Sequence, residues 1–321
     1  MIRILTDSAA DLTERELCQP GVVVVPMSVT FADGSTCEDD GSMTKDEFYE
    51  RLASDAKLPR TSQPSPAAFM QAYADAADAG DEVLVITIAQ SLSGTFQCAN
   101  LAAAEAECPV TVLDSETAAQ GESILVREAL RLREQGCTVA EIAAQLDILK
   151  KRVRIIAVVD SLKHLQKGGR VSAAVALVGG ALGIKPVLSL YDSQIRLEDK
   201  GRGRPGALVA MYKLLEKMGS IDPDYGYTLL YSDDRQLAAP VHHYMHNNLH
   251  LTGGRVGQLG AVCDARQSSP LHALCRGGHG LRDELREPRG DRSRGRRRVR
   301  ELLPLGRHAV ESARARSRRY Y

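Results

Sequence analysis

The stretch Leu84-Val-Ile-Thr-Ile-Ala-Gln-Ser-Leu-Ser-Gly-Thr-Phe96 decides how the chain is interpreted. It begins as an apolar run rich in β-branched residues, which predicts a buried strand, and residues 98–105 follow a helical pattern after a small polar turn. The backbone N–H groups and the positive dipole end of such a helix attract anions to the turn. Because the turn contains no Lys or Arg, we expect it to hold a small anionic head, such as a carboxylate, through neutral donors. The simpler alternative is that Ser91 or Ser93 only caps the helix.

Length and composition favour an ordinary two-domain protein of the cytoplasm. The chain has 321 residues, enough for two domains, and no apolar run approaches the roughly 20 residues that a membrane helix needs. The N-terminus begins directly as a strand over residues 2–6 and lacks the layout of a signal peptide. The 7 cysteines form no CxxC pair, so neither a zinc site nor a disulfide framework is indicated, and a reducing compartment fits best.

Charge divides the chain into two unequal parts. Residues 264–321 contain 16 Arg, no Lys and 7 acidic residues, whereas the preceding residues carry a net negative charge. Such different compositions are not expected within one folded unit. We therefore predict that residues 263–321 form an atypical, Arg-rich and disordered tail.

Strands and helices alternate along the rest of the chain, which predicts an α/β fold. We expect residues 1–153 to form an N-terminal domain with a mainly parallel sheet and flanking helices. Residues 154–262 are expected to form a C-terminal domain with a mixed sheet and helices. Within it, residues 185–197 are typical of a hairpin that turns at Asp192-Ser193.

Three polar loops are predicted to meet at one edge of the N-terminal sheet. They are Asp7-Ser8, residues 91–95 and Asp114-Ser115, and each follows an expected strand. Ligands of open α/β sheets bind beyond the carboxyl ends of the strands. The convergence of three loops at such ends indicates a binding site there.

Six short motifs occur in an order that resembles a known family. They are Thr6-Asp-Ser8, Thr61-Ser-Gln-Pro-Ser-Pro66, Ser91-Leu-Ser-Gly-Thr95, Asp114-Ser115, Lys167-Gly-Gly-Arg170 and Lys185-Pro186. Together they resemble the DegV family of bacterial fatty-acid-binding proteins, over residues 1–262. The resemblance implies two α/β domains that close over one bound fatty acid in a cleft. It also implies a lipid-binding subunit that is not itself an enzyme.

The same resemblance assigns residues to the ligand site. It implies that Thr61 and Ser93 hydrogen-bond the fatty-acid carboxylate, one hydroxyl from each of two loops. Burial of an acyl chain contributes about 0.8 kcal/mol per CH₂, so an apolar tunnel would supply most of the affinity while the hydroxyls orient the head. The residues expected to support the cleft are Ser62, Gly94, Thr95, Asp7 and Ser8. No catalytic residue, metal or cofactor is implied besides the bound long-chain fatty acid.

A partner enzyme is also implied by the resemblance. In the family, the fatty acid is presented to an ATP-dependent fatty acid kinase, which converts it to acyl phosphate for phospholipid synthesis. Arg170 and Arg202 match family arginines on the side of the head group where this kinase docks. The chain itself then makes no covalent bond.

The chain departs from the family pattern near its end. The last expected strand, residues 255–262, is followed by Cys263-Asp-Ala-Arg266, where the family has a turn that contains histidine. A reading-frame slip in the gene or a genuine basic extension would each explain this sequence. With a frame slip, the C-terminal domain is expected to lack its final strand and a head-group histidine.

Other functions fit the sequence less well. An enzyme acting on a small anionic metabolite at the same inter-domain cleft is the main alternative, and it predicts a short polar pocket with a base near Ser93. His242, His246 and His250 recur at a spacing that could form a metal-binding helix face, but no acidic or cysteine partner lies nearby in sequence. Nucleic-acid binding by residues 292–300 is disfavoured because no aromatic residues interleave with the arginines.

Overall fold

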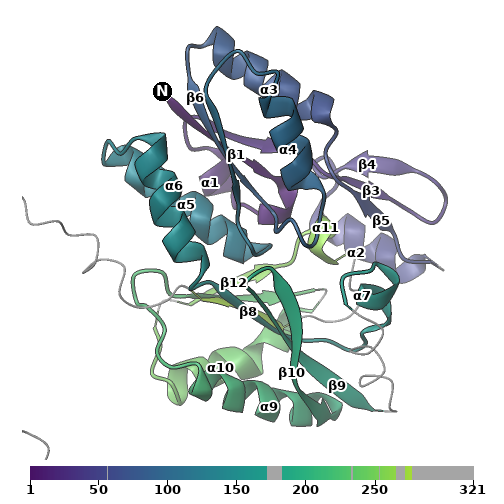
Figure 1. The fold of residues 1–321 in the computed structure, drawn as a ribbon. Helices are drawn as coiled ribbons and strands as arrows, with labels where there is room; N and C mark the ends of the chain where they lie inside the picture. Colours follow the sequence, from purple (N-terminus) through teal and green to yellow (C-terminus); the bar gives the residue numbers. More distant parts are fainter. Residues whose placement is uncertain (56, 172–182, 233, 253, 265–271, 277–321) are drawn as a thin grey trace, which may run out of the picture. The chain divides into compact units, whose positions relative to one another are not determined.

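A four-stranded parallel sheet organises the N-terminal part of the chain, which we define as residues 1–153 (Figure 1). The computed structural model describes residues 1–55, 57–171, 183–232, 234–252, 254–264 and 272–276. The strands lie in the order β2 (Val22–Val25), β1 (Ile2–Asp7), β6 (Glu82–Thr87) and β7 (Val110–Asp114). Strands of a parallel sheet are buried on both faces, which explains their nearly continuous apolar sequences. The mainly parallel N-terminal sheet that the sequence predicts is confirmed.

Helices cover both faces of this sheet (Figure 1). On one face lie α3 (Pro66–Asp78) and α4 (Thr95–Ala103), and on the other lie α5 (Gln120–Glu134) and α6 (Val139–Lys150). The remaining helical turns are η1 (Ser8–Ala10), α1 (Glu14–Leu17) and α2 (Lys45–Ser54). Local signals place these helices well: Ser65 caps α3 by accepting the Ala68 N–H at 3.2 Å, and Pro66 is the first helical residue.

A second, small antiparallel sheet is not foreseen in the sequence analysis. Its strands, in spatial order, are β4 (Thr36–Glu38), β3 (Ser28–Thr30) and β5 (Arg60–Ser62). The apolar region 22–31 is divided between two sheets at Pro26, because proline has no N–H for a ladder. In β5, Thr61 pairs with Val29, so the small sheet fixes the segment that carries the predicted carboxylate ligand.

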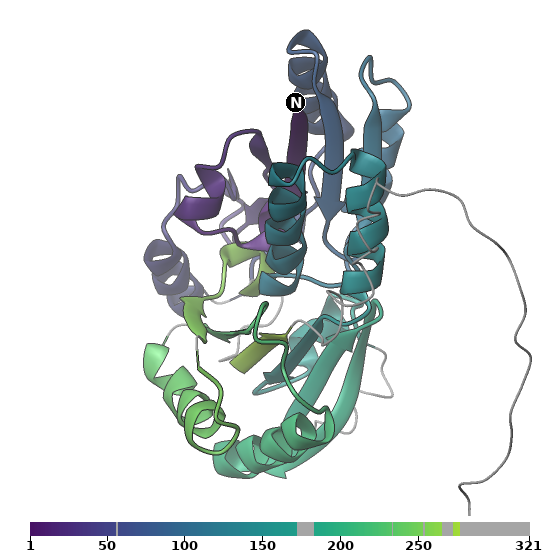
Figure 2. The same ribbon diagram turned by 90° about the vertical axis from the view of Figure 1, so that its left-hand side faces the viewer.

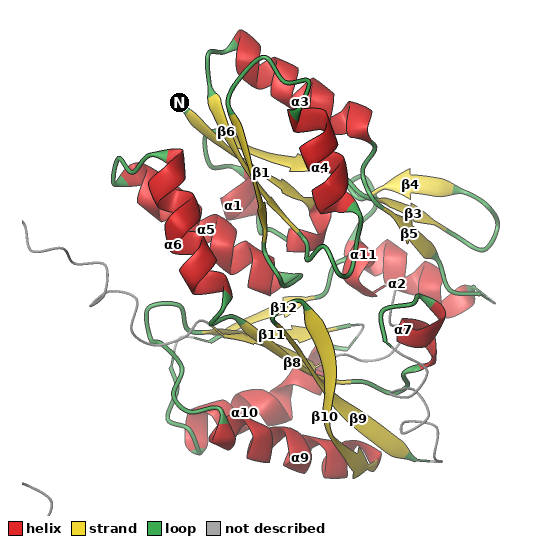
Figure 3. Ribbon diagram, in the orientation of Figure 1, coloured by secondary structure: helices red, strands yellow, loops and turns green. Residues whose placement is uncertain are grey.

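The C-terminal part, defined as residues 154–276, contains a six-stranded mixed sheet (Figure 3). Its strands, in spatial order, are β10 (Gln194–Arg202), β9 (Ile184–Tyr191), β8 (Arg154–Val158), β13 (His272–Arg276), β11 (Tyr227–Tyr231) and β12 (Arg255–Gln258). Its helices are α7 (Lys163–Lys167), α9 (Gly203–Lys217), η2 (Arg235–Ala238), α10 (Ala239–Asn247) and α11 (Ala261–Asp264). Figure 2 shows α9 and α10, at the bottom of the view, on one side of this sheet, where they form a separate apolar cluster with it. The predicted hairpin of β9 and β10 and the mixed sheet are confirmed.

The final strand is the main correction to the sequence analysis of this part. Residues His272–Arg276 form β13, which pairs antiparallel with β8 on one side and with β11 on the other. The expectation that the C-terminal domain lacks its final strand is therefore wrong. The predicted tail also begins too early, because α11 and β13 lie within or across its first residues.

All the residues that the structure describes belong to one compact unit. Most of the predicted Arg-rich tail lies outside the described residues, as do residues 173–182. None of the helices in the described ranges combines the length and the apolar character needed to cross a membrane.

Candidate functional site

The carboxyl ends of β1 and β6 are joined through Asp7. Its carboxylate accepts the N–H of Ala9 at 3.0 Å and the N–H of Ile88, the residue after β6, at 2.8 Å. Asp7 is fully buried, and it holds the loop after β1 and the loop after β6 together. Ser8, expected beside it in the cleft, accepts the Met27 N–H with its hydroxyl at 3.1 Å. Both residues therefore position the loops around the site.

The end of β7 is joined to the same loops through Asp114. Its carboxylate accepts the N–H of Gln90 at 3.2 Å and that of Glu116 at 2.9 Å. Gln90 opens the loop that follows β6, so a carboxylate at each flanking strand holds this loop. The predicted convergence of three loops at one edge of the sheet is confirmed.

The loop after β6 ends differently from the simple capping interpretation. The residue before α4 is Gly94, which offers no side chain to cap the helix. The Ser93 hydroxyl is buried and lies 2.9 Å from the hydroxyl of Thr95, which is fully buried. The idea that Ser91 or Ser93 serves only as a helix cap is therefore wrong. Neutral hydroxyls instead gather at the N-terminus of α4, where its dipole favours negative charge.

The segment with Thr61 and Ser62 reaches this loop through the next residue, Gln63. A Cβ placed on Gly94 would lie 2.1 Å from Gln63 Oε1, so the Gln63 carboxamide rests directly against the Gly94 backbone. Gln63 Nε2 also donates to the sulfur of Cys98 at 2.7 Å. Thr61 is partly buried and Ser62 is exposed. Gln63 is not among the predicted site residues; the available signal was its place in the sequence, directly after Thr61 and Ser62 and before Pro64.

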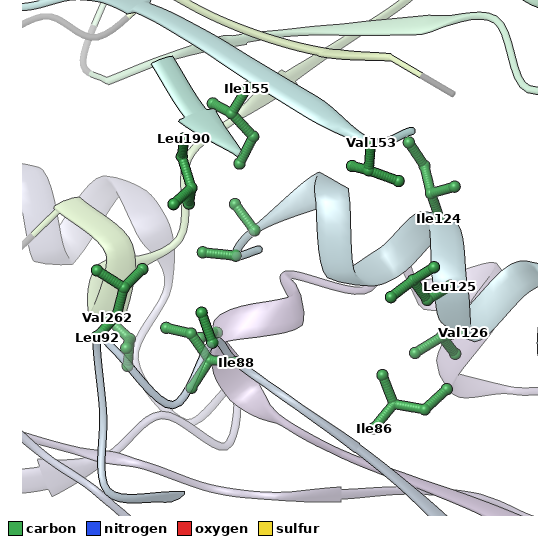
Figure 4. Packing of buried hydrophobic residues seen from close by; sticks show 14 of the residues in the cluster. Ile86, Ile88, Leu92, Ile124, Leu125, Val126, Val153, Ile155, Leu190 and Val262 are labelled. Atoms are coloured by element: carbon green, nitrogen blue, oxygen red, sulfur yellow. The ribbon is translucent and has the colours of Figure 1, made fainter. Parts of the chain in front are cut away.

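An apolar pocket lies between the two parts of the chain. The space between atoms within it is about 710 Å³, the solvent at its open mouth included. Figure 4 shows Ile88 and Leu92, from the loop after β6, and Ile155 and Leu190, from the mixed sheet. The other lining residues are Ala118, Ala119, Ala157, Leu165, Arg170, Leu188, Ser189, Ile195, Leu230, Leu259 and Cys263. Leu92 lines the pocket, and its neighbours in sequence are Ser91 and Ser93. The same loop therefore contributes both to the apolar lining and to a group of hydroxyls.

Arg170 connects the Gly-rich turn of the C-terminal part to this loop. Its Nε and Nη2 atoms each donate to the Leu92 carbonyl at 3.1 Å, and Nη1 donates to the Gly168 carbonyl. Arg170 also lines the pocket. A planar guanidinium that holds one carbonyl with two donors fixes the loop strongly. Arg170 therefore has a structural role at the site.

A second set of contacts holds the pocket wall that follows β12. Lys45 Nζ lies 2.6 Å from Asp11 Oδ1 and 2.7 Å from the carbonyl oxygen of Gln258. The N–H of Gly260 donates to the other Asp11 oxygen at 3.2 Å. Burial raises the pKa of Asp11, although Lys45 and the Gly260 N–H act in the opposite direction. These contacts bind the C-terminal segment to the N-terminal part beside the pocket.

Tyr49→Phe tests how much this wall depends on polar contacts. The Tyr49 hydroxyl donates to the carbonyl of Leu259, a pocket-lining residue, at 3.0 Å in a buried setting. Its removal leaves a buried carbonyl short of a donor and should lower the free energy of unfolding by about 1–2 kcal/mol. Urea unfolding measures this loss. Tyr212→Phe, which keeps the ring stacked on Tyr244, is the control, and an equal loss in both variants would contradict the assignment.

A fully buried glutamate lies behind the strand ends. Glu122, in the first turn of α5, accepts a hydrogen bond from the Thr6 hydroxyl at 2.8 Å. Burial and the negative charge of Asp7 raise the pKa of Glu122 well above its ordinary value, whereas the Thr6 hydrogen bond lowers it. The carboxyl group of Glu122 therefore keeps its proton at pH values where an exposed glutamate has lost it.

Comparison with known proteins bears directly on this arrangement. Residues 1–265 match the model of a family described as uncharacterised protein, DegV family. The chain belongs to the DegV family. A DegV domain-containing protein of Caldanaerobacter subterraneus subsp. tengcongensis is 31% identical over 252 residues, which are 78% of this chain and 89% of that protein. The family resemblance inferred from the six motifs is confirmed.

Solved DegV structures share the fold. A DegV family protein from Thermus thermophilus, described by its fatty acid binding, has a TM-score of 0.77 and is 30% identical; the match covers 87% of this chain and 99% of that one. The Streptococcus pneumoniae Fatty Acid Kinase (Fak) B3 protein, loaded with linoleic acid, has a TM-score of 0.74 at 22% identity, with 86% and 99% covered. The second likeness is one of fold alone. The predicted α/β fold class is confirmed.

Among the predicted site residues of this DegV chain, Arg170 lines the pocket, whereas Thr61, Ser93, Arg202 and the residues expected to support the cleft lie outside its lining. Arg202 ends β10, precedes α9 and is exposed. His242 and His246 lie on α10, but that helix ends at Asn247. His250 is therefore not on the same helix, and the three histidines do not form the metal-binding helix face that their spacing suggested. In the described ranges, no group of three or more His, Cys, Asp or Glu residues could hold a metal ion.

Proposed function

We propose that this chain binds one long-chain fatty acid between two domains, residues 1–153 and 154–276, with the acyl chain in the apolar pocket. In this proposal the hydroxyls of Thr61 and Ser93 hydrogen-bond the carboxylate. Ser62, Gly94, Thr95, Asp7 and Ser8 shape the cleft around them. The protein is a lipid-binding subunit and carries out no reaction itself.

One observation carries the proposal: the loop that lines the apolar pocket through Leu92 also bears the buried hydroxyl of Ser93 at the N-terminus of α4. An acyl chain gains about 0.8 kcal/mol per buried CH₂, so the pocket suits a long apolar ligand. A helix N-terminus with neutral donors suits its carboxylate. Fatty acid binding by the Thermus thermophilus DegV protein agrees with this.

The proposal includes a partner kinase. The kinase would transfer the terminal phosphoryl group of ATP to one carboxylate oxygen, which forms acyl phosphate and releases ADP. Exposed Arg202, and Arg170 near the loop, are the residues that we assign to the kinase side. Since such a kinase uses cellular ATP, we place the protein in the cytoplasm. Addition of a purified fatty acid kinase and ATP to loaded protein should yield acyl phosphate, trapped as the hydroxamate.

Native mass spectrometry of the purified protein tests ligand binding directly. We expect a retained mass equal to one fatty acid per chain, which organic extraction should identify. The enzyme alternative, which acts on a small anionic metabolite at the same cleft, predicts a short polar pocket instead. The pocket is lined almost wholly by apolar side chains, which supports a lipid.

Thr61→Ala combined with Ser93→Ala should weaken binding of the fatty-acid carboxylate. Loss of two hydroxyl donors to a charged group is expected to cost about 2 kcal/mol of binding free energy, roughly a 30-fold loss of affinity. Titration with a fluorescent fatty acid measures this change, and thermal unfolding checks that the fold persists. Unchanged lipid retention in the double variant would show that these hydroxyls do not hold the head group.

A further inference from the structure

Gln63 connects the two loops that carry the proposed carboxylate ligands. It follows directly after β5, two residues beyond Thr61, and its carboxamide lies against the start of α4. A Cβ on Gly94 would fall 2.1 Å from Gln63 Oε1, 2.9 Å from Cδ and 3.1 Å from Nε2. Such separations are far below contact distance, so a side chain at position 94 would force the Gln63 carboxamide to move.

The nitrogen of the same carboxamide makes a hydrogen bond one turn further along the helix. Gln63 Nε2 donates to Cys98 Sγ at 2.7 Å, and Cys98 is buried. The Gln63 carboxamide thus contacts two positions at the start of α4, Gly94 and Cys98. Ser93 immediately precedes this contact, and its hydroxyl is held by Thr95 at 2.9 Å.

We propose that Gln63 is a positioning residue that sets the separation of the Thr61 and Ser93 hydroxyls, a role that rests on the proposed fatty-acid function. Thr61 belongs to the three-stranded sheet, whereas Ser93 belongs to the loop after the four-stranded sheet. Two hydroxyls that share one carboxylate must be held within about 0.5 Å of their working positions. Gln63 supplies a contact between the two elements, and Gly94 provides the space for it.

The proposal makes Gln63 and Gly94 one functional unit. Gln63→Ala removes the contact, and Gly94→Ala displaces the carboxamide by its new methyl group. Each variant should weaken binding of palmitic acid roughly tenfold. The combined variant should be no weaker than either alone, because both changes remove the same contact.

A comparison of ligands separates positioning from general loss of structure. Methyl palmitate fills the same pocket but has no carboxylate, so its affinity should stay within about twofold of the wild-type value in each variant. Gln71→Ala, which removes an exposed glutamine on α3 that donates to Asp75, is the matched control and should change neither ligand. Equal losses for acid and ester, or additive losses in the combined variant, would overturn the proposal.

Gln63→Glu keeps the test decisive even if Gly94→Ala does not fold. This nearly isosteric change replaces the donor to Cys98 with an acceptor and places a negative charge near the bound carboxylate. Palmitic acid should lose more affinity than in Gln63→Ala, while methyl palmitate is retained; unchanged acid binding would overturn the role of Gln63. A wild-type protein that does not prefer acid over ester would instead refute the proposed carboxylate site itself.

Discussion

Ala157→Phe is expected to reduce the affinity for stearic acid about 200-fold while decanoic acid still binds. Ala157 lies in β8 and lines the pocket, together with Ile155 on the same face of that strand. The added phenyl group occupies the volume of about four methylenes, so roughly 3 kcal/mol of acyl-chain burial is lost. A shorter chain does not need the occupied space and should lose much less.

Displacement of a fluorescent fatty acid by each competitor measures the two affinities. Val209→Phe introduces the same side chain at an exposed position on α9 and should change neither affinity. Thermal unfolding of both variants checks that the mixed sheet is intact. If stearic acid bound to Ala157→Phe as tightly as to the wild type, the pocket could not be the acyl-chain site.

Local sequence signals predicted much of the fold and the placement of the loops. The apolar runs that form β1, β6 and β7 identify buried parallel strands, and their polar ends therefore meet at one sheet edge. The hairpin of β9 and β10 turns at Asp192 and Ser193, both at positive φ, as a tight two-residue turn requires. Such features depend on neighbouring residues, so one sequence is enough to find them.

Features set by distant contacts were missed. β13 is a short segment with no alternating pattern, and it becomes a strand because β8 and β11 flank it. Ser93 was the natural candidate for a helix cap, but its hydroxyl meets that of Thr95. The contact between Gln63 and Gly94 depends on how two sheets are placed. The family motifs named Thr61, Ser93 and the residues around them, whereas the part played by Gln63 required coordinates.

Glu122→Gln is expected to make the stability of the protein less dependent on pH. The raised pKa of Glu122 means that the folded state keeps a proton that the unfolded chain has released. Wild-type stability from this group is complete below the ordinary glutamate pKa and is lost as pH rises toward the folded pKa. Over that interval the loss approaches about 1.4 kcal/mol per pH unit. Glutamine cannot ionise, can still accept the Thr6 hydrogen bond, and should remove this loss.

Urea unfolding at several pH values, with the wild type and the variant compared at each, isolates Glu122 from other titrating groups. Asp81→Asn provides a control of opposite sign, because hydrogen bonds from the N-terminal ammonium group and Arg3 lower the pKa of Asp81. Stability from Asp81 is present above the ordinary aspartate pKa and is lost as pH falls. A constant stability difference between Glu122→Gln and wild type would mean that Glu122 is already ionised when folded. Because the negative charge of Asp7 acts on Glu122 and Asp7 accepts the Ile88 N–H at the start of the loop that carries Ser93, a proton on Glu122 lets the two buried carboxyl groups support that loop without mutual repulsion.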